Sequence, residues 1–218
     1  MNLLFLGLPG CGVRETARAA AERLGLRFVD TDEVLTRNLS MSLQDVYSLF
    51  TPEALRDLLE RLAGQLAGGD GYCIAVGDCF LDEPGALETL VSSGRAVCLD
   101  LSPEEAVSVC REPDHPSLRR GLFRLRELYD ERRGRLAAAS DMILSADGRT
   151  PEDLAELAAA RLAAGLPGRT SDALEENSRL LVPLLSARAE LLGITGDEKE
   201  RYIAAVLTPG RDMTEGEI

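Results

Sequence analysis

The fold of this chain depends on the stretch Gly7-Leu8-Pro9-Gly10-Cys11-Gly12-Val13-Arg14-Glu15-Thr16, which directly follows the apolar run Leu3–Leu6. The run predicts a short buried strand, and the glycine-rich turn after it leads into a predicted helix. Glycines in such a turn let backbone N–H groups point inward, and the helix adds its positive N-terminal end. Gly7 and Gly12 have the spacing of the motif G-x-x-x-x-G-K-[ST]. The stretch predicts a phosphate-binding loop, with an ordinary glycine-rich turn as the alternative.

The two positions after Gly12 depart from that motif. Val13 stands where a lysine normally reaches the β- and γ-phosphates, and Arg14 stands where a Ser or Thr hydroxyl binds magnesium. A shift by one residue would put Glu15 in the hydroxyl position, which suits phosphate less well. The loop is therefore predicted to lack its usual charge. Its candidate nucleotide contacts are Gly10, Cys11, Gly12, Val13, Arg14 and Glu15.

Length and charge limit the classes of function. The chain has 218 residues, 45% of them hydrophobic, and a net charge of −13. This length favours one α/β domain with a tail. The acidic charge argues against non-specific binding to nucleic acid or to anionic membranes. Lys199 is the only lysine, so an anionic ligand has to be held mainly by arginines.

The five cysteines, Cys11, Cys73, Cys79, Cys98 and Cys110, lack metal-site spacing and mostly lie in apolar or strand-like stretches. They predict reduced, packed thiols in a cytoplasmic protein. We expect neither a signal peptide nor a membrane span, because the sequence shows no long apolar run after a basic region.

Strand and helix patterns alternate along the chain. Predicted strands after the first are Leu26–Val29, Tyr72–Val76, Arg95–Leu101 and Met142–Leu144. Predicted helices are Arg14–Leu24, Ser42–Phe50, Pro52–Ala67, Glu83–Ser92, one from Ser102 to about Arg111, Leu118–Ala139, and one from Thr150 to about Ala164. This alternation predicts an α/β fold with a parallel sheet covered on both faces.

Two carboxylates, Asp30 and Asp32, follow the second predicted strand. Ligands bind at the carboxyl ends of the strands in open α/β sheets, so both are candidate site residues. The alternative for Asp32 is the N-cap of a helix that starts at Glu33. Arg56 lies beside the leucine stripe of its helix, where it either reaches the same edge of the sheet or is simply solvated.

The order of these motifs resembles the shikimate kinase family over residues 1–164. The resemblance rests on the loop, Asp30-Thr31-Asp32, Arg56, Gly77, Leu99-Asp100-Leu101-Ser102-Pro103-Glu104-Glu105, Arg132, and Asp147-Gly148-Arg149-Thr150-Pro151-Glu152. It implies a three-layer P-loop kinase fold with a five-stranded parallel sheet. It also implies ATP and Mg²⁺ as cofactors if the protein is active, and phosphorylation of the 3-hydroxyl of shikimate.

The resemblance also implies residue roles. Asp32 would hold the shikimate hydroxyls and orient or deprotonate the attacking one, and Asp30 would lie near magnesium through water. Arg56 and Arg132 would hold the shikimate carboxylate, and Gly77 would let a backbone N–H approach the substrate.

Several positions depart from the family pattern. Gly77-Asp78-Cys79 replaces Gly-Gly-Gly, His115-Pro116 replaces the Arg-Pro of the lid, and Gly134-Arg135-Leu136 replaces Pro-Leu-Tyr. We expect much weakened ATP turnover, because phosphoryl transfer depends on positioning and charge neutralisation. The alternative is a working shikimate kinase in which Arg14 or the lid residues Arg119 and Arg120 rebuild the phosphate site.

The predicted domains are a kinase-like domain, residues 1–165, and a helical extension with a tail, residues 166–218. An apolar stripe within residues 172–207 needs a surface to cover it, either the kinase-like domain, a second copy or a partner protein. The leading hypothesis is a shikimate kinase homologue with a degraded loop, a weak kinase or a non-catalytic binder of a small acidic metabolite. An assembly role for the extension is a further alternative.

Overall fold

The computed structural model describes residues 1–102, 105, 122–163 and 196. The chain divides into two units, Met1–Gly168 and Arg169–Ile218, and every helix and strand described here belongs to the first. The predicted lid residues His115, Arg119 and Arg120, the thiol of Cys110 and the predicted interaction surface within 172–207 lie outside the described residues. In the described part of the chain, no helix has the length and apolarity needed to cross a membrane.

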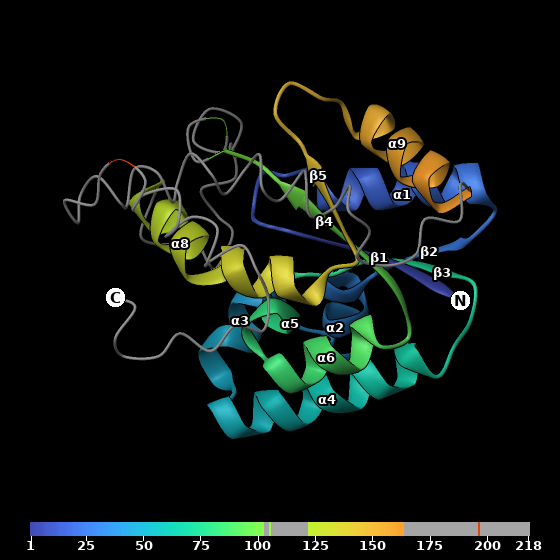
Figure 1. Cartoon of the computed structure of the whole chain (residues 1–218). Coiled ribbons are helices and arrows are strands. Elements are labelled where there is room, and N and C mark those ends of the chain that lie inside the picture. The colour runs from blue at the N-terminus through green and yellow to red at the C-terminus, as the bar shows by residue number, and fades with distance from the viewer. Residues whose placement is uncertain (103–104, 106–121, 164–195, 197–218) are drawn as a thin grey trace, which may run out of the picture. The chain divides into compact units, whose positions relative to one another are not determined.

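A five-stranded sheet forms the centre of the first unit (Figure 1). Its strands pair in parallel in the order β2-β3-β1-β4-β5. Their bounds are β1 Asn2–Gly7, β2 Arg27–Asp30, β3 Tyr72–Ala75, β4 Gly94–Asp100 and β5 Met142–Ser145. All six residues of the central β1 are buried, as expected for a strand covered on both faces. The predicted parallel sheet is confirmed.

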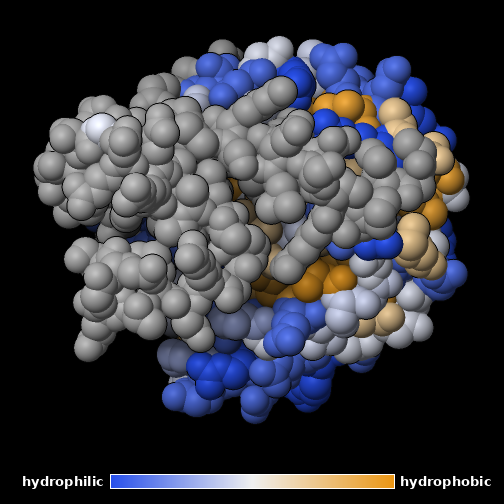
Figure 2. All heavy atoms as spheres, viewed as in Figure 1, coloured by the Kyte–Doolittle hydropathy of each residue, from blue (hydrophilic) through white to orange (hydrophobic). Residues whose placement is uncertain are grey.

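Helices cover both faces of the sheet. Their bounds are α1 Val13–Leu24, α2 Thr31–Leu39, α3 Leu43–Leu49, α4 Pro52–Ala67, α5 Asp78–Asp82, α6 Pro84–Val91, α8 Leu122–Ala139 and α9 Pro151–Ala163. Helices α1 and α9 pack together on one face, and α4 and α6 pack together on the other (Figure 1). Figure 2 shows a largely hydrophilic surface over α4, at the bottom of the view, where charged side chains such as Glu53, Asp57 and Glu60 are exposed.

Local sequence explains several helix ends. Thr51 caps α4 by accepting the N–H of Ala54, and Pro52 occupies the first turn, where its missing N–H costs nothing. Thr150 and Asp153 form the expected capping box of α9. Ser102 accepts the N–H of Glu105, as an N-cap does, although most of the helix predicted there lies outside the described residues.

One expected helix start is wrong, and one helix was not predicted. Helix α2 begins at Thr31 rather than Glu33, and its N-cap is Asp30, whose Oδ1 accepts the N–H groups of Asp32 and Glu33 at 2.9 and 3.1 Å. Asp30 is the N-cap because it is the last residue of β2 and has the extended backbone conformation that an N-cap needs. The sequence analysis also missed α5, a five-residue helix that follows β3.

Candidate active site

The loop after β1 has the backbone of a phosphate cradle. Gly10 and Gly12 adopt positive φ angles of 93° and 70°, which favour glycine. Gly12 is the N-cap of α1, and no side chain of the described residues caps this helix end. The first N–H groups of α1 are therefore available to an anion. Cys11 is buried, which raises the pKa of its thiol to about 12, so it remains neutral in the loop.

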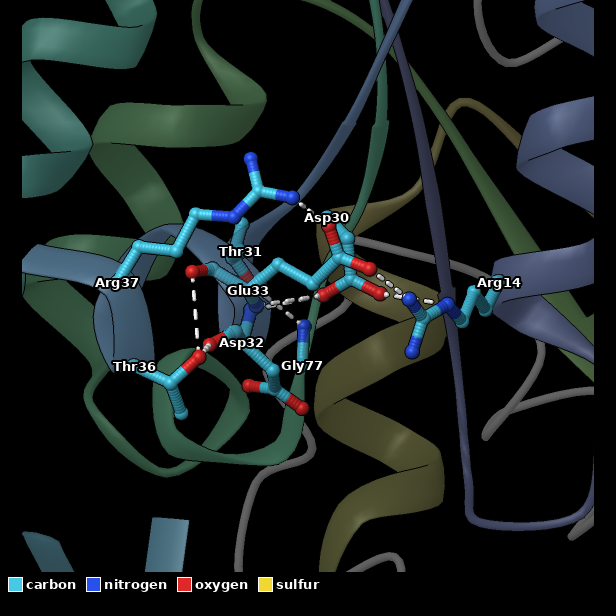
Figure 3. A network of polar contacts seen from close by, with 8 residues as sticks. All are labelled: Arg14, Asp30, Thr31, Asp32, Glu33, Thr36, Arg37 and Gly77. Carbon is cyan, nitrogen blue, oxygen red and sulfur yellow. Dashed lines mark hydrogen bonds and ion pairs between the residues drawn. The ribbon is translucent and has the colours of Figure 1, made fainter. Parts of the chain in front are cut away.

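The side chains after Gly12 bring no positive charge into this cradle. The side chain of Val13 packs against Gly7 at the base of the loop. A Cβ atom added to Gly7 would lie only 2.8 Å from Val13 Cγ2. Arg14 points to the end of β2, where its Nε lies 3.2 Å from Asp30 Oδ2 and its Nη2 contacts Glu33 Oε1 (Figure 3). The charge of Arg14 is therefore matched by protein carboxylates.

Asp30, the predicted magnesium neighbour, uses both of its carboxylate oxygens within the protein. Oδ1 caps α2 and Oδ2 pairs with Arg14, and only 7% of the residue is exposed. Within residues 1–102 and 122–163 no group of three or more His, Cys, Asp or Glu side chains is arranged to hold a metal ion. With Val13 and Arg14 in place of the lysine and the hydroxyl that directly follow Gly12 in the motif, these two positions do not fit an ATP–Mg²⁺ group held in the usual way.

Asp32 lies in the first turn of α2, with its carboxylate against Gly77 (Figure 3). Its Oδ1 is buried and has no hydrogen-bond partner among the described residues. Burial, with the charges of Asp30 and Asp78 nearby, raises the pKa of Asp32 to about 7 from an ordinary value of 3.8. A carboxylate with this pKa is suited to accept or hold a proton near neutral pH.

Gly77 occupies the N-cap position of α5, and its N–H donates to Thr31 Oγ1 at 2.7 Å. A methyl group on Gly77 would collide with the Asp32 carboxylate. Glycine is therefore required here for the close approach of Asp32, whereas the predicted substrate-facing N–H of Gly77 already has an acceptor in the protein.

Arg132, on α8, is the largest fully buried side chain of the described residues, with 1% of its surface exposed. Its Nε and Nη2 donate to the two oxygens of Asp82 at 2.9 and 2.6 Å, and its Nη1 donates to Asp78 Oδ1 at 3.0 Å. Burial lowers the pKa of Arg132, but the two carboxylates outweigh it and the net direction is upward. The arginine is a fixed cation bound to two protein carboxylates.

Arg56, the second arginine predicted to hold a ligand carboxylate, is also paired. Its Nε lies 3.2 Å from Glu83 Oε2, and its side chain is 53% exposed. The structure thus brings Asp32 and Gly77 together but gives both arginines carboxylate partners from the segment that follows β3.

The sequence singled out Asp78 as a departure from the family pattern, but it did not indicate that Asp78 pairs with Arg132, nor did it point to Asp82 or to the buried groups beside them. The hydroxyl of Tyr47 and the thiol of Cys79 lie near each other and near Asp78, and burial raises the pKa of both groups, that of Cys79 to about 12. Asp78 and Asp82 are four residues apart, which places them on one face of a helix. A helix predicted after β3 would therefore have indicated that the two carboxylates act together.

The family model for shikimate kinase matches residues 9–163. A shikimate kinase of Paracidovorax citrulli is 33% identical over 150 residues, which cover 66% of this chain and 82% of that protein. One from Symbiobacterium thermophilum is 30% identical over 159 residues, which cover 71% and 91%.

Solved structures show the same fold. The structure of shikimate kinase from Acinetobacter baumannii in complex with shikimate gives a TM-score of 0.70 at 20% identity, over 76% of this chain and 94% of that one. The shikimate kinase of Bacteroides thetaiotaomicron gives a TM-score of 0.67 at 16% identity, over 75% and 98%. The predicted P-loop kinase fold is confirmed.

Proposed function

Since the chain belongs to the shikimate kinase family, we propose that it has kept the fold of these kinases but has lost most of their ATP-dependent phosphorylation of shikimate. It acts as a weak phosphotransferase or as a non-catalytic binder of a small metabolite at Asp32. Asp32, Arg56 and Arg132 are the residues predicted to hold that ligand, and the sequence predicts that the ligand is acidic.

The observation that carries this proposal is the placement of Val13 and Arg14. Phosphoryl transfer needs positive charge close to the negatively charged phosphoryl group, and a single arginine contributes about 10³ to 10⁵ in rate in related enzymes. Val13 has no charge, and Arg14 is paired with Asp30 and Glu33 instead of facing the loop. The loop backbone remains able to hold an anion, but the described residues supply little stabilisation of the transition state.

A second candidate is a working shikimate kinase, and the observation that favours it is the raised pKa of Asp32. A base that titrates near neutral pH suits removal of a proton from a hydroxyl. In this case, arginines outside the described residues, such as Arg119 and Arg120, would supply the charge at the phosphates.

A coupled assay of ADP release from ATP and shikimate separates the two candidates. We expect turnover at least about 10³-fold below that of a shikimate kinase with the intact loop, measured in parallel. The Asp32→Asn variant is the control, since it shows whether residual turnover comes from this site. Brisk turnover in the natural chain that is lost in Asp32→Asn would contradict the proposal and establish the second candidate.

A further inference from the structure

An ion cluster formed by the buried side chains of Arg132 and Asp78 and the half-exposed Asp82 lies where the family resemblance implies a ligand carboxylate. Each of the three nitrogens of Arg132 donates to a carboxylate oxygen, at 2.6 to 3.0 Å. The contact with Asp82 is bidentate, which is the arrangement that an arginine adopts with a bound carboxylic acid. Asp82 therefore makes the same contact to Arg132 that an acidic ligand would make.

The charges of this region do not favour a second anion. Arg132 faces the carboxylates of Asp78, which is 6% exposed, and Asp82. Nη2 of Arg135 also lies 3.6 Å from Asp82 Oδ1, so two arginines balance two carboxylates and this group has no net positive charge for a ligand. The contact between Arg56 and Glu83 matches the other candidate cation with a third carboxylate. A ligand carboxylate would have to displace Asp82 or lie beside it, and like charges brought together at a site disfavour binding.

The site nevertheless offers an acceptor for a hydroxyl group. Asp32 Oδ1 is buried beside Gly77 and makes no hydrogen bond within the described part of the chain. A buried acceptor without a partner is costly, and a ligand hydroxyl that donates to it removes that cost. Asp32 therefore favours a ligand that carries hydroxyl groups.

We propose that Asp78 and Asp82 take the place of the ligand carboxylate, so that the site at Asp32 binds an uncharged polyhydroxylated compound in preference to a carboxylic acid. This inference rests on the proposed function only for the location of the ligand. Asp78 and Asp82 act here as specificity-determining residues, because they neutralise the cation that an acid would need.

Shikimate and its methyl ester provide a matched pair of probes, since they share the ring and its hydroxyls and differ in one negative charge. Each compound is titrated calorimetrically into the full chain and into the Asp82→Asn and Asp78→Gly variants. The natural chain is expected to bind the ester at least about tenfold more tightly than the acid, and each variant is expected to shift this ratio at least about tenfold towards the acid. Asp57→Asn, on the exposed surface of α4, removes the same charge and should leave the ratio unchanged.

Three results would overturn the proposal: tighter binding of shikimate than of the ester by the natural chain, a ratio that stays constant across the variants, or no saturable binding of either compound. If a variant does not fold, the preference of the natural chain between the two compounds still decides. The proposed function is tested separately, because ATP turnover plays no part in these titrations. A chain that prefers the ester and yet turns over ATP briskly would retain this inference and lose the proposed function.

Discussion

Replacement of Arg132 by methionine should destabilise the protein strongly, because it leaves Asp78 buried without this cation. Arg132 is 1% exposed and donates three hydrogen bonds, and the Asp78 side chain is 8% exposed, whereas that of Asp82 is 48% exposed and can be solvated. Removing one partner of a buried ion pair costs about 3–5 kcal/mol. For a unit of this size that loss corresponds to a melting temperature about 6–20 °C lower.

Urea unfolding followed by circular dichroism measures the change in the free energy of unfolding. The control is the same substitution at Arg23, whose contact with Glu156 lies on the surface with side-chain exposures of 48% and 67%. That variant should lose no more than about 1 kcal/mol. Combining Arg132→Met with Asp78→Ala should recover part of the loss, because the pair is then removed together. If the Arg132 and Arg23 variants differ by less than about 1 kcal/mol, the ion cluster is not buried as described.

Three further substitutions, with Gly64→Ala as a control for one of them, test the elements around Asp32. The raised pKa of Asp32 makes the folded state hold its proton more tightly than the unfolded state, so stability is lost as the pH rises from about 4 to about 7. Asp32→Asn should therefore be more stable than the natural chain by about 2–4 kcal/mol near pH 8, and urea titrations should show the gap closing by about pH 4. Gly77→Ala should lower the free energy of unfolding by about 1–3 kcal/mol, because the added methyl group collides with Asp32. The control is Gly64→Ala, where an added Cβ meets nothing within 4 Å and should stabilise α4 by about 0.5–1 kcal/mol. Similar melting curves for the two variants would contradict the close contact between Gly77 and Asp32. Asp30→Ala should lose about 0.5–2 kcal/mol as α2 loses its N-cap, and an unchanged urea midpoint would contradict that role.

The fold was accessible from sequence because its signals are local and repeated. Apolar runs such as Leu3–Leu6, capping residues such as Thr51 and Thr150, and the turn at Gly12 each predict the element that the structure contains. The start of α2 was misjudged by two residues, since both Asp30 and Asp32 are good N-caps and only the extended backbone at the end of β2 selects Asp30.

The pairing of charges in the site was not accessible in the same way. The family resemblance assigned Asp32, Arg56 and Arg132 to one ligand site, but a sequence does not show which carboxylate an arginine faces. Arg132 is 50 residues from Asp82 and 54 from Asp78 in the chain. Only the folded arrangement shows that this arginine is already bound by protein carboxylates, and that Arg14 faces the end of β2 instead of the loop.

The most direct test of the degraded phosphate site is a calorimetric titration of ATP–Mg²⁺ into the natural chain and into the Val13→Lys/Arg14→Ser double variant. The double variant restores the lysine and hydroxyl of the loop motif and removes the arginine partner of Asp30 Oδ2. We predict no saturable heat for the natural chain at millimolar ATP, and Mg²⁺-dependent binding for the variant. Equally tight, Mg²⁺-dependent binding of ATP by both proteins would contradict the account.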